Sequence, residues 1–502
     1  MQAKIKKRLR NCKRRIQYRL RKKKWHDQRR PMFQTPNIHY DLTAKDKGFH
    51  AAGLGAIQLL VERLQLARDF NTRLCLLKRH VPYYESDHIL NLTYNLLAGG
   101  KTINDLELLR TNETYLDVLG AQRSPDPTTA GDFLRRFEAA DLDTLMDVIN
   151  NKRLVVWRQQ PPTFFEQAII DADGSMVETT GACKQGMDIS HDGKWGYHPL
   201  IVSLANTQEP LFLVNRSGNR PSHEGAAAYL DRAVTLCRQA GFRKILLRGD
   251  TDFSQTTYLD GWHAAGVGFV FGFDAHPTLV EQAQRLPERL WQPLQRPVRQ
   301  PATAPRRRPA QVKEEVVRRR GFANLRLVGE QVAEFNYQPC ACRGEYLMIV
   351  VRKQLVWERH GAVIGEETRY FFYITNQWAW LPPEIVFFAN DRCNQENLIA
   401  QLKSGVRALR APSNTLLANG AYMVIGSLAW NLKAWLALLQ PTATQVRRLL
   451  TMEFRTFLAE VMLLPCQVVR AGRRLLYRLL QWSPWVDMLC QIGERLRKLR
   501  PT

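Results

Sequence analysis

Residues 164–175, with the sequence FFEQAIIDADGS, indicate how the central part of the chain folds. The short apolar run predicts a buried strand, and the acidic and turn-forming residues after it mark its end. The segments YHPLIVSLANT (197–207) and EPLFLVNRSG (209–218) predict two further strands with a short polar turn between them. We expect these three strands to be antiparallel.

Helices and strands alternate in the segments that follow. HEGAAAYLDRAVTLCRQAGF (223–242) predicts a helix ending at Gly241, and TTYLDGWHAAG (256–266) predicts a second helix. KILLRGD (244–250) and VGFVFGFD (267–274) predict short buried strands. Because helical crossovers add parallel strands, the predicted fold class is α/β, a mixed sheet with flanking helices.

The regions on either side of this sheet have other patterns. Residues from about 50 to 150 are helical in pattern, and PDPTTAGDFLRRFEAADLDTLMDVI (125–149) predicts an amphipathic helix that carries Arg135 and Arg136 as candidate DNA contacts. Alternating β-branched and aromatic residues between 325 and 376 predict a β insertion or a continuation of the sheet. From about Leu381 onwards we expect helices.

Positive charge is concentrated in three segments. The chain has 502 residues, with 72 Lys and Arg against 47 Asp and Glu, a net charge of +25. Residues 1–30 hold 15 basic residues and one acid. Residues 291–320 hold nine basic residues and two acids, and residues 441–502 hold eleven basic residues and four acids. These segments together exceed the net charge of the whole chain, so the rest is slightly acidic. A polyanion is the expected partner, nucleic acid ahead of an anionic membrane surface.

Two of the basic segments suggest particular conformations. Residues 1–30 predict either a flexible solvated tail or a helix that grips a phosphate backbone. The Pro- and Arg-rich stretch QPLQRPVRQPATAPRRRPAQVK (292–313) predicts an extended surface linker.

Several other classes of protein are disfavoured. No apolar run reaches the roughly 18 residues that span a bilayer, and the first 30 residues do not resemble a signal peptide. Nine cysteines, an odd number, argue against a disulfide framework and favour a reducing cytoplasm. Cys340-Ala-Cys342 lacks the spacing of a zinc knuckle, and we expect a structural role for it.

Histidines and aromatic residues near position 195 are further candidates. His191, His198 and His223 have no spacing typical of a zinc hydrolase. Trp195 and Tyr197 could stack on an exposed base, but packing in a β-turn is the favoured interpretation.

Carboxylates stand at the ends of two predicted strands and on one predicted helix. Asp171 and Asp173 end the first strand, and Asp250 follows another. In the predicted helix DRCNQENLIAQLKSG (391–405), Arg392, Glu396 and Lys403 lie on one face. Each acid alone is more typical of a turn, a cap or a solvated surface. Three converging carboxylates could hold divalent ions for phosphodiester chemistry.

These acids occur in three ordered motifs. Asp173-Gly174-Ser175 follows the first strand, and Asp250-Thr-Asp-Phe253 follows a later one. The third motif, Tyr-x₂-Arg-x₃-Glu-x₆-Lys, is matched by Arg392, Glu396 and Lys403, although Ala389 stands at the tyrosine position with Phe388 beside it. From about residue 50 to 440, the chain resembles the DDE-type transposases of bacterial insertion sequences, in the subgroup with a β insertion before the glutamate.

The resemblance implies an RNase H-like catalytic core and a set of site residues. Asp173, Asp250 and Glu396 would be the catalytic acids and the ligands of Mg²⁺ or Mn²⁺. Arg392 and Lys403 would contact the phosphates of the transposon end. Asp171 is the alternative first acid. Asp252 is a weaker rival of Asp250, and we expect it to cap the helix that begins near Gln255.

The resemblance also implies a function and partners. The protein would bind the inverted-repeat ends of its mobile element, cleave phosphodiester bonds by two-metal hydrolysis and transfer the 3′-OH ends to target DNA. It would act as a homodimer or higher multimer on DNA, in the bacterial cytoplasm at the nucleoid and without a membrane. Alternatives are an RNase H-like nuclease without strand transfer and a catalytically silent transposase-derived DNA-binding protein.

The patterns and the resemblance together predict a division of the chain. The expected parts are a basic arm (1–48), a helical DNA-binding domain (49–150), the first part of the catalytic core (160–275), a linker and β insertion (276–375), the rest of the core with the Glu-bearing helix (380–440) and a basic helical C-terminal region (441–502).

Overall fold

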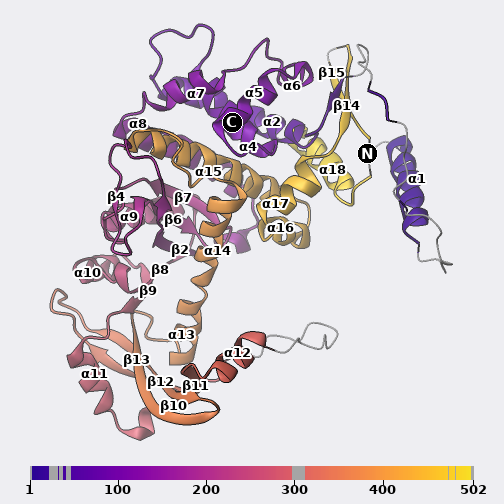
Figure 1. Ribbon diagram of the computed structural model, residues 1–502. Helices are drawn as coiled ribbons and strands as arrows, with labels where there is room; N and C mark the ends of the chain where they lie inside the picture. The colour runs from indigo at the N-terminus through magenta and orange to yellow at the C-terminus, as the bar shows by residue number, and fades with distance from the viewer. Residues whose placement is uncertain are drawn as a thin grey trace.

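The computed structural model describes residues 3–21, 32, 38–40, 47–296, 311–472, 474–480 and 482–498. A large mixed sheet extends from the middle of the molecule to one end of it (Figure 1). Its nine strands follow the order β10-β11-β12-β13-β9-β8-β2-β6-β7. The fold is therefore a mixed α/β architecture with many helices, as the sequence predicted.

The five strands at one end of the sheet form as expected. β2 (Gln167–Gly174), β6 (Leu200–Leu204) and β7 (Glu209–Val214) are antiparallel neighbours. β8 (Lys244–Gly249) and β9 (Gly268–Phe273) run parallel to β2, joined through α9 (Ala226–Ala240) and α10 (Thr256–Ala264). All six residues of β9 are buried, which explains its continuous apolar sequence.

The predicted β-rich segment continues this sheet. β11 (Asn324–Tyr337), β12 (Tyr346–Arg359) and β13 (Ala362–Thr375) form an antiparallel meander, and β10 (Gln292–Pro293) pairs with β11. β13 then pairs with β9, from Phe372 opposite Phe273 to Thr375 opposite Val270. Of the two alternatives that the sequence left open, the continuous sheet is confirmed.

Short helices accompany the meander. They are α11 (Pro277–Gln284), the 3₁₀ turn η4 (Glu288–Leu290) and α12 (Val312–Arg320). Most of the expected Pro/Arg linker, residues 297–310, lies outside the described residues. The last residues of the linker differ from the expected extended chain, because α12 begins at Val312. This helix ends at Arg320, and Gly321 caps it with a φ of +68°, which suits a glycine.

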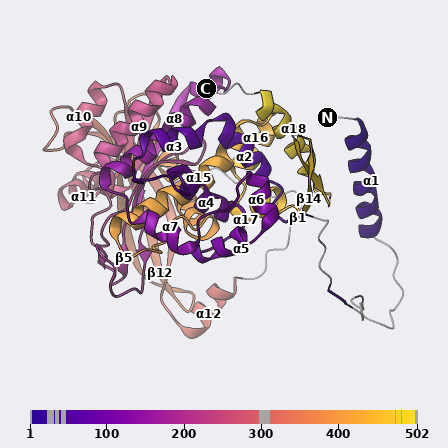
Figure 2. The same ribbon diagram turned by 90° about the horizontal axis from the view of Figure 1, so that it is seen from above.

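Helices cover one end of the sheet, as Figures 1 and 2 show from two sides. The long α15 (Leu416–Leu438) is buried along almost its whole length and packs against α4, α8 and β7. None of the described helices combines the length and the apolar character needed to cross a membrane. The N-terminal helices and turns are α2 (Leu54–Arg63), α3 (Leu66–Arg73), α4 (Glu85–Leu97), η1 (Ile103–Asp105), α5 (Leu106–Arg110), α6 (Glu113–Leu119), α7 (Pro127–Leu134), α8 (Ala139–Trp157) and η2 (Pro162–Phe165).

The helix expected to carry Arg135 and Arg136 is interrupted at those residues. α7 ends at Leu134 and α8 begins at Ala139. The interruption is stabilised because the Asp141 carboxylate accepts a hydrogen bond from the Glu138 backbone amide at 2.9 Å, which caps the start of α8. The prediction of one continuous helix was therefore wrong, and the two arginines lie in an exposed turn.

The C-terminal region is only partly helical. α16 (Ala443–Leu450), α17 (Phe454–Phe457), the π-helical turn η6 (Leu458–Met462) and α18 (Val486–Lys498) agree with the expectation. However, β14 (Cys466–Ala471) and β15 (Arg474–Leu479) form a hairpin that also pairs with β1 (Gly48–Phe49). Burial in β14 alternates from residue to residue up to Val469, a strand period that the prediction of helix overlooked.

At the N-terminus, α1 (Ala3–Leu20) is an exposed helix beside this hairpin (Figures 1 and 2). The Lys13 ammonium lies 5.8 Å from the ring centroid of Trp482. Within the basic segment 1–30, the described residues are thus almost all helical, rather than an irregular tail. The remainder of the arm, in residues 22–31, 33–37 and 41–46, lies outside the described residues.

Candidate active site

Three of the candidate acids come from elements that meet at one edge of the sheet. Asp173 is the penultimate residue of β2, and Asp250 follows β8 directly. Because β2 and β8 are parallel neighbours, their carboxyl ends lie side by side. Glu396 belongs to α14 (Cys393–Ala400), which follows α13 (Pro382–Asn390) after a break at residues 391–392.

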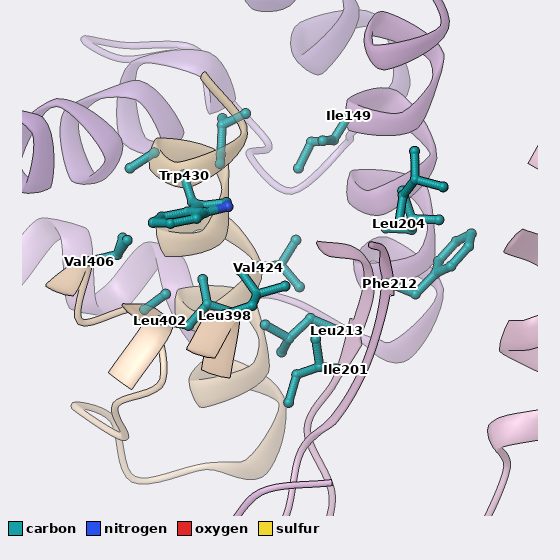
Figure 3. Close-up of a cluster of buried hydrophobic side chains, with 14 of the residues drawn as sticks. Ile149, Ile201, Leu204, Phe212, Leu213, Leu398, Leu402, Val406, Val424 and Trp430 are labelled. Atoms are coloured by element: carbon teal, nitrogen blue, oxygen red, sulfur yellow. The ribbon is translucent and has the colours of Figure 1, made fainter. Parts of the chain in front are cut away.

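An apolar face fixes the rotation of α14 against the rest of the protein. Leu398 and Leu402, four residues apart, point into a buried cluster with Val424 and Trp430 of α15 (Figure 3). Beyond Ala400 the helix widens into the π-helical turn η5 (Gln401–Gly405). Glu396 is turned away from this cluster, and its side chain is 62% exposed.

A buried glutamine ties α14 to the sheet next to Glu396. The Gln395 amide donates to the carbonyl of Ile201 at 3.2 Å, and its Oε1 accepts a hydrogen bond from the Ser203 hydroxyl. Both partners belong to β6, the neighbour of β2. Gln395 therefore sets the distance between the helix that carries Glu396 and the strand beside Asp173.

Arg392 lies among the three acids and contacts all of them. Its Nη1 is 3.0 Å from Asp173 Oδ2 and 3.5 Å from Asp250 Oδ2, and its Nη2 is 3.6 Å from Glu396 Oε1. The contact with Asp173 is a hydrogen bond between two mostly buried groups. One guanidinium thus gathers carboxylates that are far apart in the sequence.

Burial and charge shift the pKa values of these groups. Burial raises the pKa of Asp173 to about 6; Arg392 opposes this rise and the Asp250 charge adds to it. Burial also raises the pKa of Asp250, again against the effect of Arg392. Burial alone would lower the pKa of Arg392, but the three surrounding carboxylates outweigh it, so that pKa lies above its ordinary value. Arg392 therefore stays charged and favours ionised acids.

The alternative first acid, Asp171, has a different environment. It is buried, and Arg248 of β8 donates to its two carboxylate oxygens at 2.7 and 2.9 Å. Arg248 also donates to the carbonyl of Phe388 at 2.7 Å, and its guanidinium lies 4.9 Å from the ring centroid of that residue. Asp171 is thus enclosed in a buried ion pair that anchors α13 to the sheet, whereas Asp173 faces the other acids.

Asp252 does not have the capping role that the sequence suggested. α10 begins after Gln255 without a side-chain cap. Instead the carboxylate of Asp250 accepts a hydrogen bond from the Asp252 backbone amide at 3.1 Å, which closes the 3₁₀ turn η3 (Thr251–Phe253). This bond orients Asp250 so that its other oxygen faces Arg392.

The remaining candidate cations lie at different distances from the acids. Lys403 is half-buried in η5; burial lowers its pKa, and Asp173 and Glu178 are close enough to oppose that shift. Arg135 forms an ion pair with Asp132 in the helical part, and Arg136 lies next to it. The structure therefore brings Lys403, but neither of these arginines, to the candidate site.

The other motif residues are dispersed. His191 and His223 are not gathered with His198, which is half-buried beside Gly174. Burial lowers the pKa of His198. Cys342 is buried and its thiol donates to the carbonyl of Thr256, whereas Cys340 is exposed.

The carboxylates are suited to a divalent cation, but the guanidinium lies between them. In the described part of the chain, no three His, Cys, Asp or Glu side chains are grouped closely enough to hold a metal ion. Carboxylate oxygens are nevertheless the donors that Mg²⁺ and Mn²⁺ prefer, and these three already converge on one cation. The donor set therefore fits a divalent ion, provided that the ion takes the place of Arg392.

Two positioning residues were missed from the sequence. Gln395 is adjacent to Glu396 and Arg248 precedes Asp250 by two positions, so each was visible in a quoted motif. A buried polar residue inside an otherwise apolar strand or helix face is the signal that could have identified them, because such groups need partners.

The chain belongs to the DDE-domain transposases. The family described as "Transposase DDE domain group 1" matches residues 48–501, which is most of the chain. Among solved structures, the chain is similar to piggyBac transposase in a cryo-EM structure of its synaptic complex with hairpin DNA. The identity is 10% and the TM-score 0.35, over 92% of this chain and 87% of that chain. No curated protein matches the chain in sequence.

Proposed function

We propose that the protein is a DNA transposase that binds the inverted-repeat ends of its own element, hydrolyses phosphodiester bonds and transfers the 3′-OH ends to target DNA. The observation that carries this proposal is the convergence of Asp173, Asp250 and Glu396 on one cation at the carboxyl edge of the sheet. Membership of a transposase family supports it.

The catalytic core is proposed to be RNase H-like. The order β9-β8-β2-β6-β7, with β2, β6 and β7 antiparallel and β8 and β9 parallel to β2, supports this assignment. The proposed division keeps the core in two pieces, 160–275 and 380–440, around the insertion 276–375. The helical part 49–150, with Arg135 and Arg136, and the basic terminal regions would bind DNA.

Asp173, Asp250 and Glu396 are the residues that would hold the metal, Mg²⁺ or Mn²⁺. When bound, such ions activate the attacking oxygen and stabilise the leaving oxygen of a phosphodiester. Arg392, released from the acids, would be free to pair with a phosphate of the transposon end. Lys403, about two turns beyond Glu396, would contact a second phosphate.

Replacement of Glu396 by glutamine tests this proposal. Glu396→Gln keeps the size of the side chain but removes its charge, so we expect loss of cleavage of labelled inverted-repeat ends with end binding retained. Glu281→Gln is a matched control: Glu281 is also 62% exposed and also pairs with an arginine four positions away, but it lies on α11. Full cleavage by Glu396→Gln would overturn the proposal.

The same labelled ends discriminate between the alternatives. Joining of the labelled 3′ ends to target DNA supports a transposase, whereas cleavage without joining identifies a nuclease. End binding without nicking under any divalent ion identifies a silent DNA-binding protein. Two ends held in one complex would support the proposed dimer or higher multimer.

A further inference from the structure

A large cavity lies between the helical N-terminal part and the strands that follow Asp173 along the chain. Its volume is about 1080 Å³. Its walls come from the loop at Lys101, residues of the segment 178–195 with β3 (Val177–Glu178) and β5 (Trp195–Tyr197), the segment 407–412 after η5, and Tyr422 of α15. These are four separate stretches of the chain, so the cavity depends on the tertiary fold.

The walls of this cavity are strongly basic. Lys101, Lys194, Arg407 and Arg410 line it, against the single carboxylate of Glu178. Glu178 pairs with Lys194, with 3.1 Å between Oε1 and Nζ. Three cations therefore remain without an acid on the cavity wall, and an anionic occupant would compensate them.

An exposed tryptophan stands among these cations. The side chain of Trp195 lines the cavity and is 52% exposed, whereas Tyr197 of the same strand is buried and donates its hydroxyl to the carbonyl of Gln185 at 2.8 Å. The expected turn-packing role therefore applies to Tyr197 alone. A large aromatic face left open beside positive charge suits a nucleic-acid base between two phosphates.

The backbone at Arg407 is held in a strained conformation. Its φ is +63°, a region that non-glycine residues seldom adopt. The segment is fixed from both sides: Tyr422 donates to the Arg407 carbonyl at 3.4 Å, and Gly426 of α15 allows Ala408 to pack directly against the helix. Strain of this kind is found where a side chain must be presented to a ligand.

Lys403 connects the cavity to the acids. Lys403 lies in η5, between Glu396 and the cavity residue Arg407, and Glu178 on the cavity wall follows Asp173 by only five residues. Burial lowers the pKa of Lys403, and Glu178 and Asp173 both oppose that shift. A polynucleotide strand whose phosphates pass Lys403 would therefore extend from the acidic site into the cavity.

The size of the cavity suits a single strand. Its volume of about 1080 Å³ lies at the upper end of the roughly 300–1,000 Å³ of pockets that enclose most of a small ligand. It can hold a short run of nucleotides but cannot enclose a double helix, so we take the occupant to be a single strand.

We infer that this cavity binds a short single-stranded DNA segment continuous with the strand at the acids, with a base stacked on Trp195 and phosphates on Lys101, Lys194, Arg407 and Arg410. The inference rests on the proposed function, in which a strand end becomes available at the acids. It adds a second site, which reads no sequence and holds an unpaired strand.

Oligonucleotide binding to the full chain tests this inference. A labelled single-stranded oligothymidylate is titrated with excess relaxed circular duplex DNA present, which occupies the other basic surfaces. Trp195→Ala should weaken binding about 5-fold to 150-fold, the range for loss of one base–aromatic stack. Trp378→Ala is the matched control, since Trp378 is 48% exposed but does not line the cavity, and its affinity should stay unchanged.

The salt dependence tests the phosphate contacts. Lys101→Gln should reduce the slope of log K against log salt by about 0.7, the contribution of one phosphate contact to a single strand. Lys244→Gln is the control, because exposed Lys244 starts β8 at the opposite end from Asp250. Equal affinities and equal slopes in all four variants would overturn the inference.

Photocrosslinking locates the strand without relying on a variant. An oligonucleotide with 5-iododeoxyuridine should crosslink to the peptide that contains Trp195. A crosslink confined to the basic termini would overturn the inference. This test can fail independently of the proposed function. Cleavage by Glu396→Gln would overturn the proposed function whether or not DNA crosslinks at Trp195, and absence of that crosslink would overturn only the inference about the cavity.

Discussion

Replacement of Arg392 by glutamine should increase the affinity of the protein for divalent metal ions. In the structure, the guanidinium occupies the space between Asp173, Asp250 and Glu396. An ion that uses the same oxygens must first break these contacts. Gln removes the charge and leaves the three carboxylates to repel one another, so ion binding relieves a repulsion instead of breaking an ion pair.

The size of the effect follows mainly from the contact with Asp173. This pair is 3.0 Å long, with side chains only 19% and 14% exposed, and a hydrogen bond to a charged group contributes about 1.5–3 kcal/mol. Glu396 is 62% exposed, so its contact adds little after solvent screening. Because Mn²⁺ no longer has to displace the guanidinium, Arg392→Gln should bind Mn²⁺ about 10-fold to 150-fold more tightly than the parent.

The measurement is a Mn²⁺ titration of the DNA-free protein, followed by electron paramagnetic resonance of the free ion or by calorimetry. A larger metal-induced rise in melting temperature should accompany the tighter binding. Arg392→Lys keeps the charge but loses the planar fork, and its affinity should lie between those of the parent and Arg392→Gln. Arg285→Gln removes an arginine that pairs with a single exposed glutamate, and it should leave Mn²⁺ binding unchanged.

Equal or weaker Mn²⁺ binding by Arg392→Gln would refute this reasoning. It would mean that the ion and the guanidinium occupy the acids together or that the ion binds elsewhere. Retention of the parent melting temperature without metal would be needed to exclude a misfolded variant.

Three further predictions concern stability. Arg248→Met leaves the buried Asp171 charge without a partner, so the free energy of unfolding should fall by about 3–5 kcal/mol and the melting temperature should fall with it. Adding Asp171→Asn removes the unpaired charge and should restore much of this stability. Burial lowers the pKa of Lys433 to about 7, so between about pH 7 and 9 the unfolded chain binds more protons at this residue than the folded chain does. The free energy of unfolding of the parent should therefore rise by on the order of 1 kcal/mol per pH unit relative to that of Lys433→Met. An equal pH dependence of the melting temperature in the two proteins would contradict this prediction. Leu402→Ala should cost about 2–5 kcal/mol by leaving a cavity beneath η5, whereas the same change at Leu108, which is 72% exposed, should be nearly neutral.

The sequence predicted the sheet well because its strands have strong local signals. β8 and β9 are short apolar runs, and the helix between them ends at Ala264, two residues before Gly266, whose φ is +68°. The acidic edge could also be anticipated, since the carboxyl ends of parallel strands meet. These properties depend on neighbours along the chain or on a fixed rule of topology.

Contacts between distant residues could not be predicted in the same way. Arg392 and Asp173 are 219 positions apart, and periodicity places Arg392 on a face without saying what the face meets. The Asp141 side chain caps α8 and stabilises the break after α7, and the hairpin of β14 and β15 is completed by pairing with the distant β1. In each case tertiary or capping interactions outweighed local propensity.

The pairing of β13 with β9 has a consequence for engineering the protein. Without the meander of β11, β12 and β13, β9 would become an edge strand, and its unpaired amides and carbonyls, flanked by apolar side chains such as Phe271, would face solvent. Such edges join to one another and cause aggregation. A minimal core made by excising the meander would therefore be expected to self-associate, and trimming should stop within the distal parts of β12 and β13, leaving residues 372–375 in place to close the sheet.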